Sequence, residues 1–295
     1  MAPRLSVSQI TTFRSSFGED VRNYTEAGFD GIGIWEMKLG EDRAADAEKL
    51  EALEASGLAR ASAIPDTPSI LPLPLFGGSE DPQERLDSLC ASVERLAAFR
   101  PPAMVCLTGS GSGRDADEAR SIVVDGLRTL AAEAERHGMR IGIEPYERES
   151  GEPWTIVSSV ADAVELIRDA GDPPALGIQF DTWHLWNSES LYDDIAHEID
   201  RFVGVHVNDT RDETRGFADR VLPGDGVADV PRILRALEDA GWNGLYDIEI
   251  FSDDGTFGSD YPDSLWAADP KSLLSAARDA FTRCNPPSPT LKEST

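Results

Sequence analysis

The sequence has few basic residues, few histidines and few cysteines. Its 295 residues include 27 Lys and Arg against 54 Asp and Glu, a formal charge of −27. Such a chain lacks the clustered cations that contact nucleic-acid phosphates or anionic lipids, so we expect neither nucleic acid nor a membrane as a partner. Three widely spaced cysteines without a CxxC pair predict free thiols in a reducing, cytoplasmic environment rather than a disulfide or zinc framework.

Long hydrophobic runs are also missing. No apolar run approaches the roughly 18–20 residues that span a bilayer. The first residues, Met1 to Leu5, lead straight into a strand pattern without the apolar core of a signal peptide. The segment after this first predicted strand, residues 9–14, contains no glycine and therefore lacks the dinucleotide-binding fingerprint of a doubly wound sheet.

Short apolar runs of strand length alternate with segments of helical period along the whole chain. The predicted strands cover residues 5–10, 31–36, 58–64, 103–108, 140–146, 175–181, 202–208 and 245–251. Eight strand-then-helix units, averaging roughly 37 residues each, are typical of a TIM barrel. We therefore predict an α/β fold, a single-domain (β/α)8 TIM barrel over residues 1–284, followed by a disordered C-terminal tail at residues 285–295; an open doubly wound sheet is the rival.

Metal-competent side chains stand where four consecutive predicted strands end. Glu144, Asp181 and Glu249 each end an apolar run, and His206 follows Val-Gly-Val. The carboxyl ends of the strands form the functional face of a TIM barrel, so we expect these four groups to share one sector of its rim. Three carboxylates and one imidazole suit Mn²⁺, our first choice, or Mg²⁺ or Co²⁺, with Zn²⁺ as a further alternative.

Taken singly, each of these residues has a simpler explanation. A glutamate at a strand end is usually a solvated charge or an ion-pair partner. Four acid and imidazole groups crowded at one mouth, however, repel or desolvate one another unless a cation joins them. We therefore favour one divalent metal ion over four unrelated charges on the rim.

The residues around these positions resemble a known family. Glu144-Pro, Asp181-x-x-His184, Val-His206-Val and the late Glu249 are similar to the pattern of the sugar phosphate isomerase/epimerase family of xylose-isomerase-like TIM barrels. The resemblance spans the whole barrel and is most specific from the predicted strand at 140–146 onward. It implies that Glu144, Asp181, His206 and Glu249 hold one divalent metal ion and that His184 contacts the substrate.

A loop after the predicted strand at 202–208 adds to this resemblance. Its sequence Asp-Arg220-Val-Leu-Pro-Gly-Asp-Gly is similar to the R-x-x-P-G-x-G loop of the epimerase branch, which implies that Arg220 holds a substrate oxygen. Compared with the short epimerase loop, this chain has extra residues at 208–218; an ion pair on the surface is the alternative for Arg220. Trp183 is a candidate to stack on a sugar face, with packing as the alternative.

The set of ligands predicts proton transfer beside a carbonyl group. A metal ion bound to a substrate carbonyl and its neighbouring hydroxyl acidifies the C–H between them by stabilising an enediolate. Glu144 and Glu249 come from different strands, so one can remove the proton and the other return it. We therefore predict a divalent-metal-dependent isomerase or epimerase of a small carbohydrate: a sugar, keto-sugar or polyol derivative.

Three other functions stay open. A lyase on the same scaffold, either an inosose-type dehydratase or a subunit of a keto-glycoside or C-glycoside deglycosidase, would use the same residues. A metal-dependent endonuclease for abasic sites shares this barrel, but it needs a basic groove and more metal ligands than four histidines and a charge of −27 suggest. A non-catalytic sugar-binding protein would bind no metal ion. A homo-oligomer is also left open.

Overall fold

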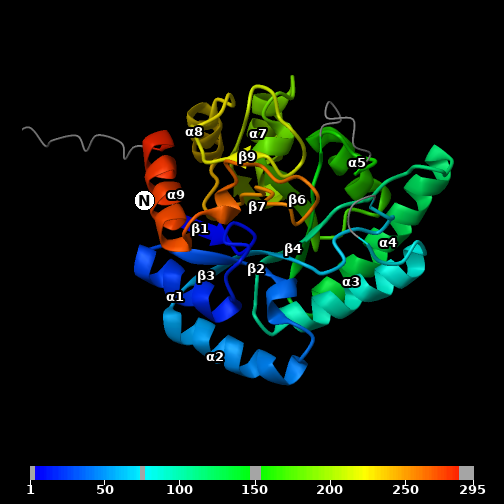
Figure 1. Ribbon diagram of the computed structural model, residues 1–295. Coiled ribbons are helices and arrows are strands. Elements are labelled where there is room, and N and C mark those ends of the chain that lie inside the picture. The colour runs from blue at the N-terminus through cyan, green and yellow to red at the C-terminus, as the bar shows by residue number, and fades with distance from the viewer. Residues whose placement is uncertain (1–3, 74–76, 147–153, 286–295) are drawn as a thin grey trace, which may run out of the picture.

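The computed structural model describes residues 4–73, 77–146 and 154–285. Within these ranges eight parallel strands close into a barrel, and helices surround the strands (Figure 1). The predicted (β/α)8 TIM barrel is therefore confirmed, and the rival open sheet is wrong because the last barrel strand pairs with the first. Apart from Asn285, the predicted tail lies outside the described residues.

The barrel strands follow one another in the order of the sequence, as right-handed βαβ crossovers require. Each pairs in parallel with its neighbours, and β10 closes the barrel against β1. The eight barrel strands in the described part of the chain are β1 (Arg4–Ser8), β2 (Gly31–Trp35), β3 (Ala59–Ile64), β4 (Ala103–Cys106), β5 (Arg140–Ile143), β6 (Leu176–Asp181), β7 (Phe202–Val207) and β10 (Leu245–Ile248).

The outer layer is made of amphipathic helices that bury one face against the strands. The longer helices are α1 (Phe17–Ala27), α2 (Asp46–Ser56), α3 (Pro82–Ala97), α4 (Ala116–Arg136), α5 (Val160–Asp169), α7 (Leu191–Glu198), α8 (Val230–Ala240) and α9 (Pro270–Cys284). Shorter turns are α6 (Thr182–Leu185), η1 (Glu36–Leu39), η2 (Arg43–Ala45), η4 (Ile199–Arg201) and η5 (Leu265–Ala267). No helix in the described ranges is long and apolar enough to cross a bilayer.

The ends of the helices follow local sequence signals. Ser16 and Ser159 each begin a helix with a capping box. In each box the serine side chain accepts a hydrogen bond from the backbone N–H of the acid three residues later, and the side chain of that acid accepts one from the backbone N–H of the serine. Gly28 and Gly241 end α1 and α8 in the left-handed conformation, which glycine adopts without a steric penalty. These short-range signals place the helices that hold the barrel.

The interior of the barrel contains polar side chains that fit because their neighbours are glycines. A Cβ on Gly33 would lie 2.1 Å from Asp247 Oδ2, and one on Gly204 would lie 2.1 Å from Gln179 Oε1. The carboxylate of Asp247 and the amide of Gln179 therefore occupy space that a larger residue would fill. Ser62 donates to Gln179 Oε1 at 2.7 Å, so the barrel is polar beneath its mouth.

A buried ion pair joins α1 to the segment that follows β2. Lys38 Nζ donates to Asp20 Oδ2 at 2.7 Å and to the carbonyl oxygen of Thr12 at 2.8 Å. Asp20 also accepts from the side chains of Gln9 and Thr12, at 3.0 and 2.6 Å. Both side chains are almost fully buried, and every oxygen of the carboxylate has a donor.

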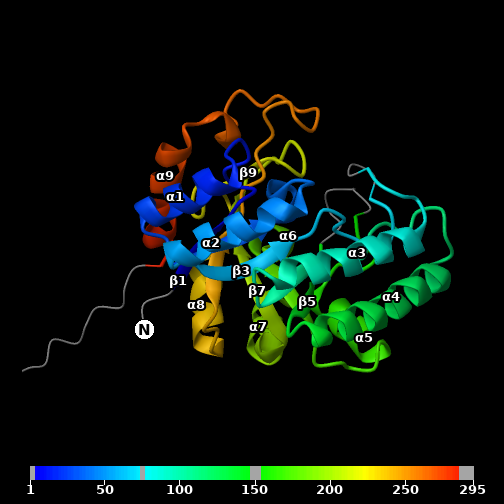
Figure 2. The ribbon, with the colours of Figure 1, turned by 90° about the horizontal axis from the view of Figure 1, so that it is seen from below.

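The loops that follow the strands form the mouth of the barrel. In Figure 2 the long loop after β10, drawn in orange, rises on the same side as the loop after β1. The loop after β7 contains a two-stranded antiparallel sheet of β8 (Asp209–Thr210) and β9 (Arg220–Val221). Asp209 ties this loop together by accepting from the backbone N–H groups of Gly224, Gly226 and Ala228 at 2.9–3.0 Å.

Candidate metal and substrate site

The carboxyl ends of β5, β6, β7 and β10 bring together the four residues predicted to hold a metal ion. Asp181 ends β6, His206 lies in β7, and Glu144 and Glu249 directly follow β5 and β10. The register pairs Asp181 with His206 across β6 and β7. All four side chains are buried, which differs from the solvated rim charges that single strand-end acids usually form.

The His206 ring lies at the centre of this group. Its Nδ1 is 3.3 Å from Glu144 Oε1, 3.4 Å from Glu249 Oε2 and 3.7 Å from Asp181 Oδ2. Asp181, His206 and Glu249 can each turn one ligand atom to a common point, with these atoms within 4.8 Å of one another. Glu144, Asp181 and His184 form a second such group. We call Glu144, Asp181, His184, His206 and Glu249 the acid–imidazole cluster.

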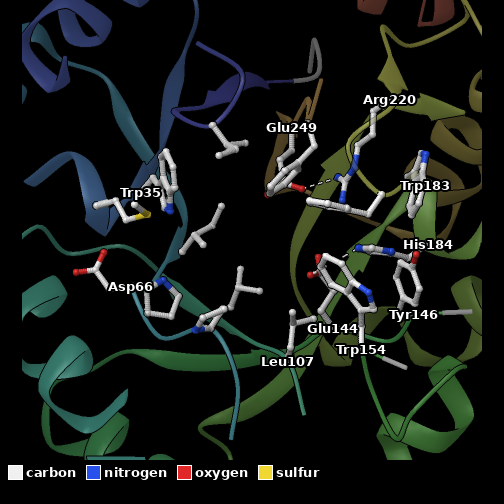
Figure 3. Close-up of a pocket in the computed structure, with 18 residues that line it drawn as sticks. Trp35, Asp66, Leu107, Glu144, Tyr146, Trp154, Trp183, His184, Arg220 and Glu249 are labelled. Carbon is white, nitrogen blue, oxygen red and sulfur yellow. Dashed lines mark hydrogen bonds and ion pairs between the residues drawn. The ribbon is translucent and has the colours of Figure 1, made fainter. Parts of the chain in front are cut away.

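Arg220 reaches this cluster from β9. Its Nη1 donates to Asp181 Oδ2 at 2.9 Å. The same atom donates to Glu249 Oε2 at 2.7 Å (Figure 3). The guanidinium carbon lies 5.2 Å from the ring centre of Trp183 and 4.7 Å from that of Phe251. The alternative of a surface ion pair is wrong, because Arg220 is buried and both of its acid partners belong to the cluster.

Asn208, which directly follows β7, orients Asp181. Its Nδ2 donates to Asp181 Oδ1 at 3.1 Å and to the carbonyl oxygen of Glu249 at 3.1 Å. Asp181 Oδ1 also accepts from the backbone N–H of Trp183 at 2.7 Å, which makes Asp181 the N-cap of α6. Strand alternation places Asn208 on the same face as His206, two residues earlier, so this role could have been inferred.

Burial and mutual repulsion shift the pKa values of the cluster. Burial raises the pKa of Glu144 and of Glu249. Burial would also raise the pKa of Asp181, but Arg220 and the two imidazoles hold it below its usual range. Burial lowers the pKa of His184 to about 3, so this imidazole is neutral. His206 behaves differently, because the surrounding carboxylates outweigh burial and raise its pKa.

These residues fit a divalent cation. With the acids ionised and His206 neutral, as a metal ligand requires, three carboxylates and Arg220 leave a net charge of about −2, which a divalent ion neutralises. Within the described part of the chain, Glu144 Oε1 and His206 Nδ1, which face each other, are buried without a hydrogen bond of good geometry. Buried polar atoms are normally paired, so atoms of this kind pointing to one place are what a metal site requires. Oxygen donors with a single imidazole nitrogen suit Mn²⁺, Mg²⁺, Co²⁺ or Zn²⁺.

A pocket opens beside the cluster, and its space, including the part open to solvent, is about 800 Å³. The predicted substrate residues His184, Arg220 and Trp183 all line it, with Glu144 and Glu249. Figure 3 shows these five side chains on one side of the pocket. The structure also places in its wall several residues that the sequence analysis did not select: Tyr146, Trp154, Phe217 and Phe251.

Tyr146 is a new wall residue in contact with the cluster. Its ring stands edge-on to that of His184, with centres 4.4 Å apart. Tyr146 follows Glu144 by two residues, so the alternation of the strand was a signal for it. The positions of Trp154 and Phe217 depend on how two long loops fold, and local sequence carries no signal for that.

The family model for the xylose isomerase-like TIM barrel matches residues 21–277. The chain therefore belongs to this family. Among curated proteins it is 27% identical over 139 residues to the inosose isomerase of Bacillus licheniformis, a match covering 46% of this chain and 48% of the relative. It is 28% identical over 152 residues to the inosose dehydratase of Geobacillus thermodenitrificans, covering 46% and 49%. The chain thus spans about half the length of the curated relatives it matches.

A solved structure supports the same fold over nearly the whole chain. The IOLI protein, described with a binding zinc atom, superposes with a TM-score of 0.75 at 20% sequence identity. The match covers 95% of this chain and 98% of that chain. At this identity the likeness shows the fold alone.

Proposed function

We propose that this chain is a divalent-metal-dependent isomerase or epimerase that acts on a sugar, a keto-sugar or a polyol derivative. The observation that carries the proposal is the acid–imidazole cluster, with buried and unpaired ligand atoms at the mouth of a barrel of this family. The relatives named inosose isomerase and inosose dehydratase support a polyol-like substrate. The zinc atom in the similar IOLI structure supports a metal ion here, and Mn²⁺ is our candidate because oxygen ligands outnumber nitrogen.

In this proposal Glu144, Asp181, His206 and Glu249 hold the ion. When bound, the ion would polarise a substrate carbonyl and stabilise the negative charge that develops as the neighbouring C–H loses its proton. Asn208 and the N-terminus of α6 keep Asp181 in one orientation. His206 lies between Glu144 and Glu249, because β7 stands between β5 and β10 in the barrel order.

Proton transfer falls to Glu144 and Glu249. Both carboxylates are buried and line the pocket, where each can reach a substrate C–H and accept or release its proton. Approaching from strands on either side of β7, one carboxylate removes the proton and the other returns it. Arg220 and neutral His184 donate hydrogen bonds to substrate oxygens, and Trp183 covers one face of the substrate. The cytoplasmic location and a homo-oligomeric state stay predictions.

A lyase is the second candidate, favoured by the match to a curated dehydratase. It would use the same proton abstraction and then expel a β-hydroxyl group. Both reactions are compatible with the same cluster, so the product distinguishes them.

The test combines metal analysis with solvent deuterium. The purified chain is analysed for bound metal, stripped with a chelator, reloaded with Mn²⁺ and incubated in D₂O with inososes, ketoses and keto-glycosides. An isomerase or epimerase gives a product of unchanged formula that contains deuterium, whereas a lyase gives deuterium together with loss of water or aglycone. Full activity in the stripped protein, or no bound metal and no exchange with any of these compounds, would contradict the proposal.

A further inference from the structure

Aromatic rings form a nearly continuous chain around the mouth of the barrel. Neighbouring ring centres along it are 5.6, 6.0, 5.6, 4.7, 6.1 and 5.8 Å apart. We call the following seven described side chains, in this order, the aromatic belt: Trp35, Phe13, Phe257, Phe217, Trp154, Tyr146 and Trp183. Five of them line the pocket, and Phe13 and Phe257 connect Trp35 to Phe217.

The pocket is polar at one end, and the rest of its described wall is apolar apart from Asp66. Of the 18 described residues that line it, five carry a charged or imidazole group: Asp66, Glu144, His184, Arg220 and Glu249. Four of these stand together, while Asp66 lies across the pocket near Trp35 (Figure 3). The other 13 are aromatic, aliphatic or proline residues.

Hydroxyl groups need partners wherever water is excluded from them. A bare sugar or cyclitol has hydroxyls around its whole ring, whereas beyond the acid–imidazole cluster the described wall offers mainly ring faces and aliphatic groups, alongside indole N–H groups, the Tyr146 hydroxyl and the Asp66 carboxylate. This composition favours an apolar group on the part of the substrate that faces away from the cluster.

The outer edge of the pocket carries a second sign of an apolar ligand. Met37 lines the pocket and is 57% exposed. Exposed large hydrophobic residues are uncommon in the described part of this chain, and Val227 is the other example. Methionine is flexible and polarisable, so it adapts to the shape of a flat apolar group. The apolar wall thus continues from the belt to the surface.

We infer that the substrate carries a planar, apolar substituent, of the aryl type, on its sugar or cyclitol ring. The ring enters the acid–imidazole cluster, and the substituent stacks against Trp154 and Phe217 of the aromatic belt. This inference rests on the proposed function for the reacting end of the pocket. It adds the chemical class of the remaining part of the substrate: an aryl-substituted carbohydrate rather than a free one.

Binding of matched glycosides tests the inference without any need for turnover. Isothermal titration calorimetry of the full, Mn²⁺-loaded chain compares phenyl with methyl D-glucosides, in both anomeric forms. Burying one phenyl group should tighten binding by about ten- to a hundredfold in at least one anomer. Equal affinity of phenyl and methyl glucosides for both anomers would overturn the inference.

Variants locate the phenyl group within the pocket. Phe217→Ala and Trp154→Ala should each bring the phenyl-to-methyl affinity ratio close to one, with little change for the methyl glucosides. Tyr192→Ala is the matched control, because Tyr192 lies on α7 and packs beside Arg232, outside the pocket. Retention of the ratio in both pocket variants would also overturn the inference. If an alanine variant unfolds, Phe217→Leu removes the flat ring while keeping an apolar side chain.

The proposed function and this inference can fail separately. Deuterium exchange with unsubstituted ketoses, together with equal affinity for phenyl and methyl glucosides, would preserve the proposed function and overturn the aryl preference. A phenyl preference that depends on the belt, without any metal or exchange, would preserve an aryl-carbohydrate site and remove the proposed reaction.

Discussion

The protein buries charged side chains in two places, and the two are built differently. Asp20 and Lys38 form a closed pair, in which Gln9, Thr12 and the lysine supply donors to the carboxylate. The acid–imidazole cluster holds three carboxylates against one arginine, and Glu144 Oε1 and the His206 nitrogens make no hydrogen bond within the described residues. Both places are desolvated, so burial alone does not distinguish them.

The Asp20–Lys38 pair and the acid–imidazole cluster differ in how completely their polar groups are hydrogen-bonded. A buried ion pair whose groups are all satisfied joins two segments and has no capacity to bind anything else. A buried cluster with excess negative charge and ligand atoms that make no hydrogen bond is energetically unfavourable, and a bound cation would make it more favourable. We therefore expect substitutions in the Asp20–Lys38 pair to alter stability, and substitutions in the acid–imidazole cluster to alter activity.

The largest effect should come from Glu144→Gln and Glu249→Gln. Each variant loses a group proposed both to transfer a proton and to hold the ion, so kcat/KM should fall by about a thousandfold or more. Thermal unfolding should be unchanged or shifted upward, because a desolvated carboxylate is removed from a crowded site. Steady-state kinetics and metal content measure the first part, and a melting curve the second. Full activity in either variant would contradict the proposed mechanism.

Lys38→Met should lower stability and leave activity unchanged, the reverse of the effect expected for Glu144→Gln and Glu249→Gln. Removing one partner of a buried ion pair leaves an uncompensated charge, and the free energy of unfolding should fall by about 3–5 kcal/mol. The activity per folded molecule should stay the same, because Lys38 does not line the pocket. Urea unfolding measures the loss. Lys271→Met is the matched control: its partner Glu26 is 2.7 Å away, but both are exposed, and such pairs contribute about 0–1 kcal/mol.

The loss in Lys38→Met should also depend on pH. Burial raises the pKa of Asp20 to about 6 although Lys38 opposes the shift. A raised acid pKa contributes stability that is present below the unfolded pKa and is lost as pH rises through the folded pKa. Without Lys38 the folded pKa of Asp20 rises further, so the loss should be larger at pH 8 than at pH 5.

Unfolding of the native protein and of Lys38→Met at both pH values tests this prediction. A further Asp20→Asn change removes the titrating group and serves as the control. An equal loss at pH 5 and pH 8 would show that the cost comes from lost packing rather than from the charge of Asp20.

The smallest effect on function is expected from a substitution of Asp247. This residue is buried inside the barrel like Asp20, but it lies beside His206 of the acid–imidazole cluster. Asp247 Oδ2 lies 3.9 Å from His206 Nε2, and burial raises the pKa of Asp247 to about 7. An ionised carboxylate there favours the His206 tautomer with hydrogen on Nε2, which leaves Nδ1 free for an ion.

Asp247→Asn should weaken Mn²⁺ binding by about tenfold, which competition with a chelating dye measures. It should also slightly raise unfolding stability at pH 8, where the buried carboxylate is charged. Unchanged metal affinity would show that Asp247 does not orient His206 for metal binding.

Periodicity and turn signals predicted all eight barrel strands, because each strand and helix buries one face locally. The same logic predicted that Glu144, Asp181 and His206 come together, since parallel strands end at one face of a barrel. Asn208 and Asp247 could also have been found, because each lies two residues from a selected residue on the same strand face.

The partners of Arg220 and Lys38 could not be predicted in this way. The contact of Arg220 with Asp181 and Glu249 depends on the two-residue strands β8 and β9, which are too short to show a period. Lys38 meets Asp20 across two separate βα connections, and Phe217 meets Trp154 across two loops. Contacts of this kind are set by tertiary packing, for which a single sequence carries no local pattern.

The β8–β9 sheet has a consequence for how this barrel could change its specificity. Because Asp209 fixes the segment at 224–228 and Arg220 pairs beside Thr210, the two ends of the intervening stretch, residues 211–219, are anchored independently of its length. That stretch carries Phe217 into the pocket wall. Another loop sequence could therefore replace it and change the pocket wall, while the acid–imidazole cluster stays in place.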